Sequence, residues 1–263
     1  MGFERPSSCP PWDGLHHRSF NLETLGFETD TIERFKKLIR QPSGLILLNG
    51  PTGSGKTTTL YATVNEISTP DVNVITVEDP VEYQIKGINQ IQVSEKSGLT
   101  FAKGLRAILR HDPDVVLIGE IRDEETARIA IQASLTGHLV FSTLHTNDAP
   151  ATVTRLKDMG IQPFMICATV EAILAQRLVR RICTKCREET KVSTSMLADL
   201  GMKTEDIAGK KFFKGTGCDN CNNTGYKGRI ALFELMILND KIRDMVLGNA
   251  STDELRELSL IHI

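Results

Sequence analysis

A glycine-rich stretch, Gly50–Thr57, has the residue types and spacing of a phosphate-binding loop. Its sequence, GPTGSGKT, matches every position of the pattern G-x-x-x-x-G-K-[ST]. Glycines let the backbone turn so that successive N–H groups point at a phosphate, which side chains would obstruct. Lys56 is expected to reach the β- and γ-phosphates, and the Thr57 hydroxyl to bind Mg²⁺. The predicted binding residues are Gly50, Pro51, Thr52, Gly53, Ser54, Gly55, Lys56, Thr57 and Thr58.

The segments on either side have the character that such a loop needs. Leu45–Leu48 is a short apolar run, typical of a buried parallel strand. Residues 58–67 are predicted to form a helix whose amino terminus faces the anion. A glycine-rich surface turn is the alternative interpretation, and these neighbours disfavour it.

Carboxylates follow two other predicted strands. Glu120 comes after the apolar run Val115–Ile118 and is the leading candidate for the base that polarises an attacking water. Glu78 and Asp79 follow a β-branched run, where they could help to hold Mg²⁺ or the water. The alternatives are a solvated loop glutamate at 120 and helix-capping acids at 78 and 79. Glu82 is a weaker candidate for the same site.

Two histidines and two arginines are further candidates. His145 follows the predicted strand 139–144 and could sense the γ-phosphate, whereas His138 precedes that strand. The two are seven residues apart and are not expected to form a metal pair, and a lone histidine is often structural. Arg106 and Arg110 share one face of a predicted helix and could reach a neighbouring subunit's phosphates, or simply be solvated.

Strand and helix patterns alternate from residue 29 to residue 180. This order predicts an α/β fold with a mostly parallel sheet covered on both faces. Pro150 and Pro163 suit first helical positions, and the 3.6-residue period predicts helices of about ten and about eighteen residues there.

Four cysteines are arranged as two C-x-x-C pairs, Cys183 with Cys186 and Cys218 with Cys221. This spacing is typical of a tetrahedral zinc site that folds a segment too small for its own core. A redox C-x-x-C site is the alternative. Cys167 is expected to be a buried apolar residue.

The composition and charge of the chain argue against several classes of protein. The 263 residues carry a formal net charge of −2, so we expect no basic field of the kind that gathers nucleic acid. No apolar run approaches the ~20 residues needed to span a bilayer, and no signal peptide is recognisable. We therefore expect a cytosolic protein.

Four stretches together point to a known family: Gly50–Thr57, Ile75–Tyr83, Asp112–Asp123 and Gly137–Thr146. Through them the chain resembles the motor ATPases of type II secretion and type IV pilus assembly, of the GspE/PilB type. The resemblance covers about residues 21–255. It implies a RecA-like ATPase core, use of ATP, a homo-hexameric ring, an inner-membrane platform protein as partner and a location peripheral to that membrane. It also favours roles for Glu78, Glu120 and His145.

Four units are expected along the chain. Residues 1–20 are predicted to be a disordered leader that need not be native, and 21–180 to be the ATPase core. The cysteine unit is expected at 181–230, followed by a helical segment at 231–263 that is shorter than in the family. The last six residues, 258–263, match a translated sequencing adaptor and are not expected to be native.

Two other functions stay open at this point. One is a hexameric nucleic-acid-translocating ATPase with a zinc ribbon, which should carry a basic surface with aromatic side chains. The aromatic content of 5% and the near-neutral charge disfavour it. The other is a nucleotide-gated scaffold without turnover.

Overall fold

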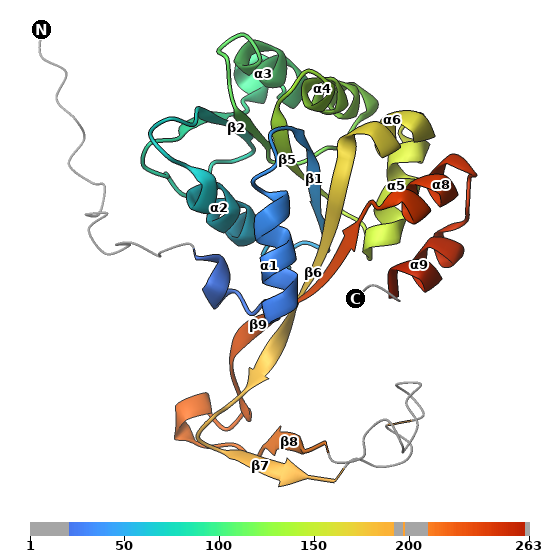
Figure 1. The fold of residues 1–263 in the computed structure, drawn as a ribbon. Coiled ribbons are helices and arrows are strands. Elements are labelled where there is room, and N and C mark those ends of the chain that lie inside the picture. Colours follow the sequence, from blue (N-terminus) through green and yellow to red (C-terminus); the bar gives the residue numbers. More distant parts are fainter. Residues whose placement is uncertain (1–20, 192–196, 198–209, 261–263) are drawn as a thin grey trace, which may run out of the picture.

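The computed structural model describes residues 21–191, 197 and 210–260 (Figure 1). The expected leader at 1–20 lies outside the described residues, as do 261–263. The main sheet contains β1 (Gly44–Asn49), β2 (Val74–Glu78), β3 (Asn89–Gln92), β4 (Val115–Ile118), β5 (Leu139–Leu144), β6 (Val170–Ile182) and β9 (Tyr226–Ile237). The helices are α1 (Thr29–Leu38), α2 (Lys56–Ile67), α3 (Phe101–Ile108), α4 (Glu124–Leu135), α5 (Ala149–Asp158), α6 (Pro163–Thr169), α8 (Asp240–Leu247) and α9 (Thr252–Leu260).

The main sheet has the strand order β3-β2-β4-β5-β1-β6-β9. Its first six strands are parallel to their neighbours, and only β9 is antiparallel, against β6. The predicted α/β class with a mostly parallel sheet is therefore confirmed. All the parallel strands end at one edge of the sheet, where loops from separate parts of the sequence meet.

Helices cover both faces of the sheet (Figure 1). Side chains alternate along β1, so that Leu45 and Leu47 pack on one face while Ile46 and Leu48 pack on the other. The first pair belongs to a core shared with α3, α4, α5, α6, α8 and α9. The second pair packs with α1 and α2. Burial on both sides explains why β1 reads as a continuous apolar run.

The sequence predicts several of these elements closely. Strands were expected at 115–118 and 139–144, and β4 and β5 have these bounds. The helix after the phosphate loop and the ten-residue helix near Pro150 are also present, as α2 and α5. Asp148 ends the loop before α5, and its carboxylate accepts a hydrogen bond from the Ala151 N–H, which fixes the start of that helix.

The predicted eighteen-residue helix from Pro163 is wrong. Helix α6 spans only seven residues, and the chain then enters the thirteen-residue strand β6. Val170 starts this strand, which pairs with β1 on one side and β9 on the other. Pairing with two strands from distant parts of the sequence outweighs the local helical period.

Residues after 225 also differ from expectation. The segment predicted as helical from 231 begins with strand β9, which completes the main sheet through Ile237. The single helical piece expected at 241–258 is two helices, α8 and α9. A turn with Asn249 at a φ of 57° separates them.

Strands β6 and β9 extend beyond the body of the molecule as a two-stranded ribbon (Figure 1). At its far end lies a small two-stranded sheet of β7 (Arg187–Thr190) and β8 (Phe212–Gly215), close to the four paired cysteines. The cysteine unit is thus carried between the two strands of the ribbon. Among the described helices, none combines the length and apolar character that a membrane crossing requires.

Candidate active site

The phosphate-binding loop runs from the end of β1 to the start of α2. Gly50, Gly53 and Gly55 have φ values of 144°, 78° and 91°, which side chains rarely adopt. A Cβ at Gly50 would lie 2.3 Å from the Gln176 carbonyl oxygen, so the loop needs glycine there. Its backbone is therefore shaped to receive an anion at the amino terminus of α2.

Lys56 is the first residue of α2 and is buried. Its Nζ donates to the carbonyl oxygens of Gly50, at 2.7 Å, and Pro51, at 3.2 Å. Burial lowers the pKa of Lys56, and the charge of Glu120 opposes that shift. A buried ammonium whose hydrogen bonds go to backbone carbonyls favours an anionic ligand, because an anion offers stronger charge compensation.

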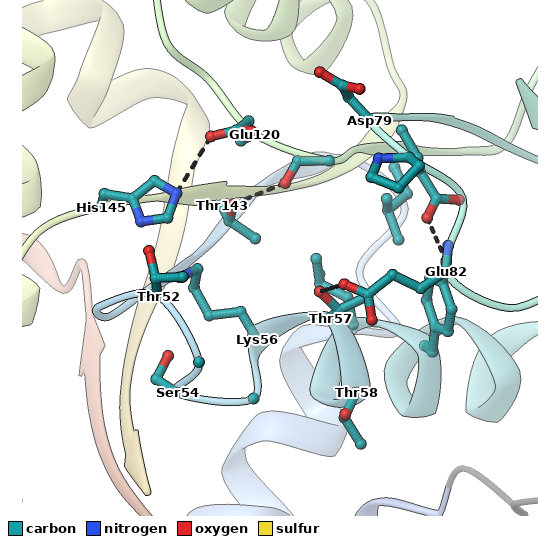
Figure 2. Close-up of a pocket in the computed structure, with 18 of the residues that line it drawn as sticks. Thr52, Ser54, Lys56, Thr57, Thr58, Asp79, Glu82, Glu120, Thr143 and His145 are labelled. Atoms are coloured by element: carbon teal, nitrogen blue, oxygen red, sulfur yellow. Dashed lines mark hydrogen bonds and ion pairs between the residues drawn. The ribbon is translucent and has the colours of Figure 1, made fainter. Parts of the chain in front are cut away.

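A cavity of about 390 Å³ opens over this loop at the carboxyl edge of the sheet. It brings together most of the predicted site residues, from separate loops (Figure 2). The polar and charged lining residues are Thr52, Ser54, Lys56, Thr57, Thr58, Tyr61, Glu78, Asp79, Glu82, Glu120, Thr143, His145 and Arg229.

Glu120 and His145 both line this cavity and their side chains contact each other (Figure 2). The distance from His145 Nε2 to Glu120 Oε2 is 3.2 Å, and Arg122 donates to the other carboxylate oxygen at 2.5 Å. Burial would raise the pKa of Glu120, but Arg122 and His145 together outweigh burial and hold that pKa below its ordinary value. Glu120 is therefore ionised at neutral pH and can accept a hydrogen bond.

Glu78 is the last residue of β2 and is buried at the wall of the cavity. One carboxylate oxygen accepts a hydrogen bond from the Tyr61 hydroxyl, and the other accepts from Thr76, at 2.5 Å, and Gln90, at 3.1 Å. Burial raises the pKa of Tyr61, and the hydrogen bond to Glu78 raises it further. Three protein donors thus hold the Glu78 carboxylate in one orientation.

Glu82 approaches the phosphate loop more closely than the sequence suggested. Its Oε1 lies 3.1 Å from the hydroxyl oxygen of Thr57, and both side chains line the cavity (Figure 2). The pair presents oxygen atoms of the kind that Mg²⁺ binds. Asp79 points away from Lys56 and Thr57 in Figure 2 and lies 4.0 Å from Arg122.

Three of the weaker candidates lie elsewhere in this chain. His138 precedes β5, at the opposite end of the strand from His145, and its ring contacts the carbonyl oxygen of Ala133 at 2.9 Å. Arg106 and Arg110 line a separate surface pocket, which His138 also lines. None of the three lines the cavity over the phosphate loop.

Some lining residues were not found from the sequence. Tyr61 contacts both Glu78 and the backbone N–H of Glu82, yet its place in the helical pattern gives no sign of this role. Leu178 and Arg229 enter the cavity from the β6–β9 ribbon. Their positions depend on the unexpected strand β6, so no sequence signal could have located them.

The four paired cysteines form a second candidate site. Their Sγ atoms all lie within 4.8 Å of one another, with 3.9 Å between Cys183 and Cys218 and 3.8 Å between Cys186 and Cys221. A zinc ion with four thiolates at 2.3 Å in tetrahedral geometry needs sulfurs about 3.8 Å apart. A hydrogen bond from Asn220 lowers the pKa of Cys183 to about 6. The geometry therefore fits a tetrahedral metal ion.

Comparison with known proteins places the chain in a family. The model of the family described as "Type II/IV secretion system protein" matches residues 15–260. The chain belongs to this family. The predicted resemblance is thereby confirmed.

Two curated members of the family illustrate the similarity. Over 238 residues the chain is 51% identical to the type IV pilus assembly ATPase PilB of Thermus thermophilus, a match that covers 90% of this chain and 27% of that protein. Over 232 residues it is 50% identical to the type II secretion system ATPase E of Vibrio cholerae, with 88% and 45% covered. The chain thus spans less than half the length of these relatives.

Two solved structures share the fold. The crystal structure of the pilus retraction motor PilT with bound ADP matches with a TM-score of 0.66 and 31% identity, covering 92% of this chain and 59% of that chain. The ATPase DotB of Legionella pneumophila matches with a TM-score of 0.61 and 26% identity, covering 91% and 57%. The predicted RecA-like ATPase core is consistent with both likenesses.

Proposed function

We propose that this chain is the nucleotide-binding portion of a motor ATPase that drives type IV pilus extension or type II secretion. The observation that carries the proposal is the convergence of Lys56, Thr57, Glu120 and His145 around one cavity above a phosphate-binding loop. The names of the relatives, a pilus assembly ATPase and a secretion ATPase, supply the process. We propose that the chain assembles as a homo-hexamer, and that the hexamer docks on an inner-membrane platform protein from the cytoplasmic side.

The reaction is hydrolysis of ATP to ADP and inorganic phosphate. The oxygen of a water attacks the γ-phosphorus, the bond to the β–γ bridging oxygen breaks, and the water gives up a proton. Glu120 is our candidate to orient this water and accept its proton, because it is ionised and faces the cavity. His145 would contact the γ-phosphate, and Lys56 would bind the β- and γ-phosphates.

Bound Mg²⁺ would neutralise charge on the phosphate oxygens. Thr57 and Glu82 are suited to hold it, directly or through water, since their oxygens lie 3.1 Å apart at the loop. Glu78 is proposed to shape the same region from the wall of the cavity, where Tyr61, Thr76 and Gln90 orient its carboxylate.

The cysteine unit is proposed to be a structural Zn²⁺ site. The sulfur spacing and the scarcity of apolar residues around β7 and β8 support this assignment. We propose a unit at 181–230, as expected from the sequence, inserted between the two strands of the ribbon. The ATPase core then comprises residues 21–180 together with the part of β9 that follows residue 230, and α8 and α9 form the carboxy-terminal segment.

Binding and hydrolysis test the proposal separately. The Lys56→Ala variant should lose binding of fluorescent ATP and ADP analogues by at least ~10-fold, because a buried charge partner of the phosphates is removed. Lys37→Ala removes an exposed lysine from α1 and is the matched control, with unchanged affinity expected. Unchanged affinity in Lys56→Ala would overturn the proposed nucleotide site.

Hydrolysis separates the motor from its alternatives. In the longest hexameric form of the protein, Glu120→Gln should keep ATP binding while the hydrolysis rate falls at least ~100-fold. A wild-type protein that binds ATP without hydrolysing it would support the nucleotide-gated scaffold. Stimulation of hydrolysis by single-stranded DNA or RNA would support the nucleic-acid translocase.

A further inference from the structure

Asn49 joins the phosphate loop to the loop that carries His145. It is the last residue of β1, directly before Gly50, and its side chain is fully buried. The carboxamide Nδ2 lies 2.7 Å from Thr146 Oγ1, 2.9 Å from Thr152 Oγ1 and 2.5 Å from the carbonyl oxygen of Asp148. All three acceptors belong to the segment 146–152, between β5 and the first turn of α5.

The orientation of this carboxamide follows from its partners. The Asp148 carbonyl oxygen can only accept a hydrogen bond, so the atom that faces it must be the nitrogen of Asn49. The two threonine hydroxyls lie 2.7 Å apart and also bond to each other. One buried amide therefore ties together a backbone carbonyl and two side chains of the same loop.

These hydrogen bonds of Asn49 lie directly beside His145. In the parallel pairing of β1 with β5, Asn49 is the partner of Leu144, the residue that precedes His145. Thr146, which follows His145, is bonded to Asn49. The residues on both sides of His145 are thus held in place, Leu144 by backbone pairing and Thr146 by a side-chain hydrogen bond. They fix the position of the His145 imidazole, whose Nε2 lies 3.2 Å from Glu120.

We propose that Asn49 is a positioning residue that sets the His145 imidazole against Glu120 and relates both to the phosphate loop. Asn49 is not proposed to touch the nucleotide. Without its Nδ2, the carbonyl of Asp148 loses a buried donor, and the loop can relax away from β1. The expected effect on catalysis rests on the proposed ATPase function, whereas the role of Asn49 in positioning the His145 imidazole does not.

The geometric claim is tested by NMR on the full chain. In wild-type background, Glu120→Gln should shift the Cε1–Hε1 signal of His145, which a His145→Ala spectrum identifies. In Asn49→Ala background, the same replacement of Glu120 should shift that signal much less, because the two side chains no longer meet. If Asn49→Ala does not fold, Asn49→Asp, which is of the same size, takes its place.

A second asparagine supplies the matched control. Asn73 also bridges loops through Nδ2, to the carbonyl oxygens of His111 at 2.9 Å and Asp112 at 3.0 Å, before β2 at the opposite edge of the sheet. Asn73→Ala should lower the free energy of unfolding yet keep the full response of His145 to Glu120→Gln. An unchanged response in Asn49→Ala would overturn the proposal and leave Asn49 with a purely structural role.

Kinetics then measure the consequence for the reaction. In protein that hydrolyses ATP, Asn49→Ala should lower kcat roughly 10- to 100-fold with little change in KM, as expected for a misplaced contact near the reacting atoms. Adding Asn49→Ala to the His145→Ala variant should cause no further fall in kcat. A raised KM with unchanged kcat would contradict the positioning role. Absence of turnover in wild type would reject the proposed function, while the NMR result still decides the geometry.

Discussion

The His145 Nε2 atom lies 3.2 Å from the Glu120 Oε2 atom, although 25 positions separate them in the sequence. The contact exists because β4 and β5 are adjacent and parallel, so that the loops which follow them leave the sheet side by side. It gives the carboxylate a cationic or hydrogen-bonding neighbour on the cavity side. Arg122 occupies the other side of the same carboxylate.

Arg122→Ala should raise the pKa of Glu120. The folded pKa is lowered because the bond and charge of Arg122, with a contribution from His145, outweigh the effect of burial. A lowered folded pKa contributes stability above the unfolded pKa of about 4.3, and this contribution is lost as pH falls through the folded pKa. The pKa is read from the Glu120 carboxyl signal by ¹³C NMR.

Arg122→Ala should also change how the free energy of unfolding depends on pH. The difference in free energy of unfolding between wild type and Arg122→Ala should be present at pH 7 and shrink as pH falls below about 4.3. Arg128→Ala, which removes an exposed ion pair with Glu124 on α4, is the control and should leave the Glu120 pKa unchanged. A difference that persists undiminished at pH 3 would argue against this linkage.

Tyr61→Phe should destabilise the protein and disturb the acidic segment after β2. The variant removes the hydroxyl that donates to one carboxylate oxygen of Glu78 and accepts a hydrogen bond from the Glu82 N–H. A hydrogen bond to a charged group is worth about 1.5–3 kcal/mol, and the carboxylate left behind is buried. Denaturant unfolding monitored by circular dichroism gives the change in free energy.

Tyr226→Phe is the matched control for this experiment. Tyr226 is partly exposed on the ribbon, and Arg180 lies over its ring, which phenylalanine preserves. The expected change is below about 0.5 kcal/mol. Equal effects of the two replacements would show that the Tyr61 hydroxyl does not anchor Glu78.

The main elements of the site were predictable because the signals are local. The phosphate loop is a contiguous motif, and β1 and β5 are mainly apolar strands that are buried on both faces. Parallel pairing then places Glu120 and His145 at one edge without any knowledge of their side-chain contacts. The sequence could therefore nominate these residues, although not the distance between them.

The features that could not be predicted depend on distant partners. Residues 170–180 have an apolar pattern that suits either a helix or a buried strand, and only pairing with β1 and β9 decides between them. Leu178 and Arg229 reach the cavity through that pairing. The donors to Glu78 are likewise scattered, with Tyr61 on α2 and Gln90 on β3.

The cysteine unit gives the last prediction, that the full chain binds one Zn²⁺ ion per polypeptide. The four sulfurs are spaced for tetrahedral coordination, as a structural zinc ion requires. Elemental analysis of protein purified without chelator should find one zinc, and Cys183→Ser should lower this content and the melting temperature. Cys167→Ala, which removes the buried thiol of α6, should retain the full zinc content.

Thiol chemistry distinguishes this metal site from a redox pair. Zinc should protect Cys183, Cys186, Cys218 and Cys221 from a thiol reagent under native conditions, and a strong chelator should release the metal and expose all four. A redox site would instead yield disulfides on mild oxidation, with no metal released by the chelator. Metal-free protein with four free thiols, no zinc uptake and an unchanged melting temperature would refute the structural zinc site.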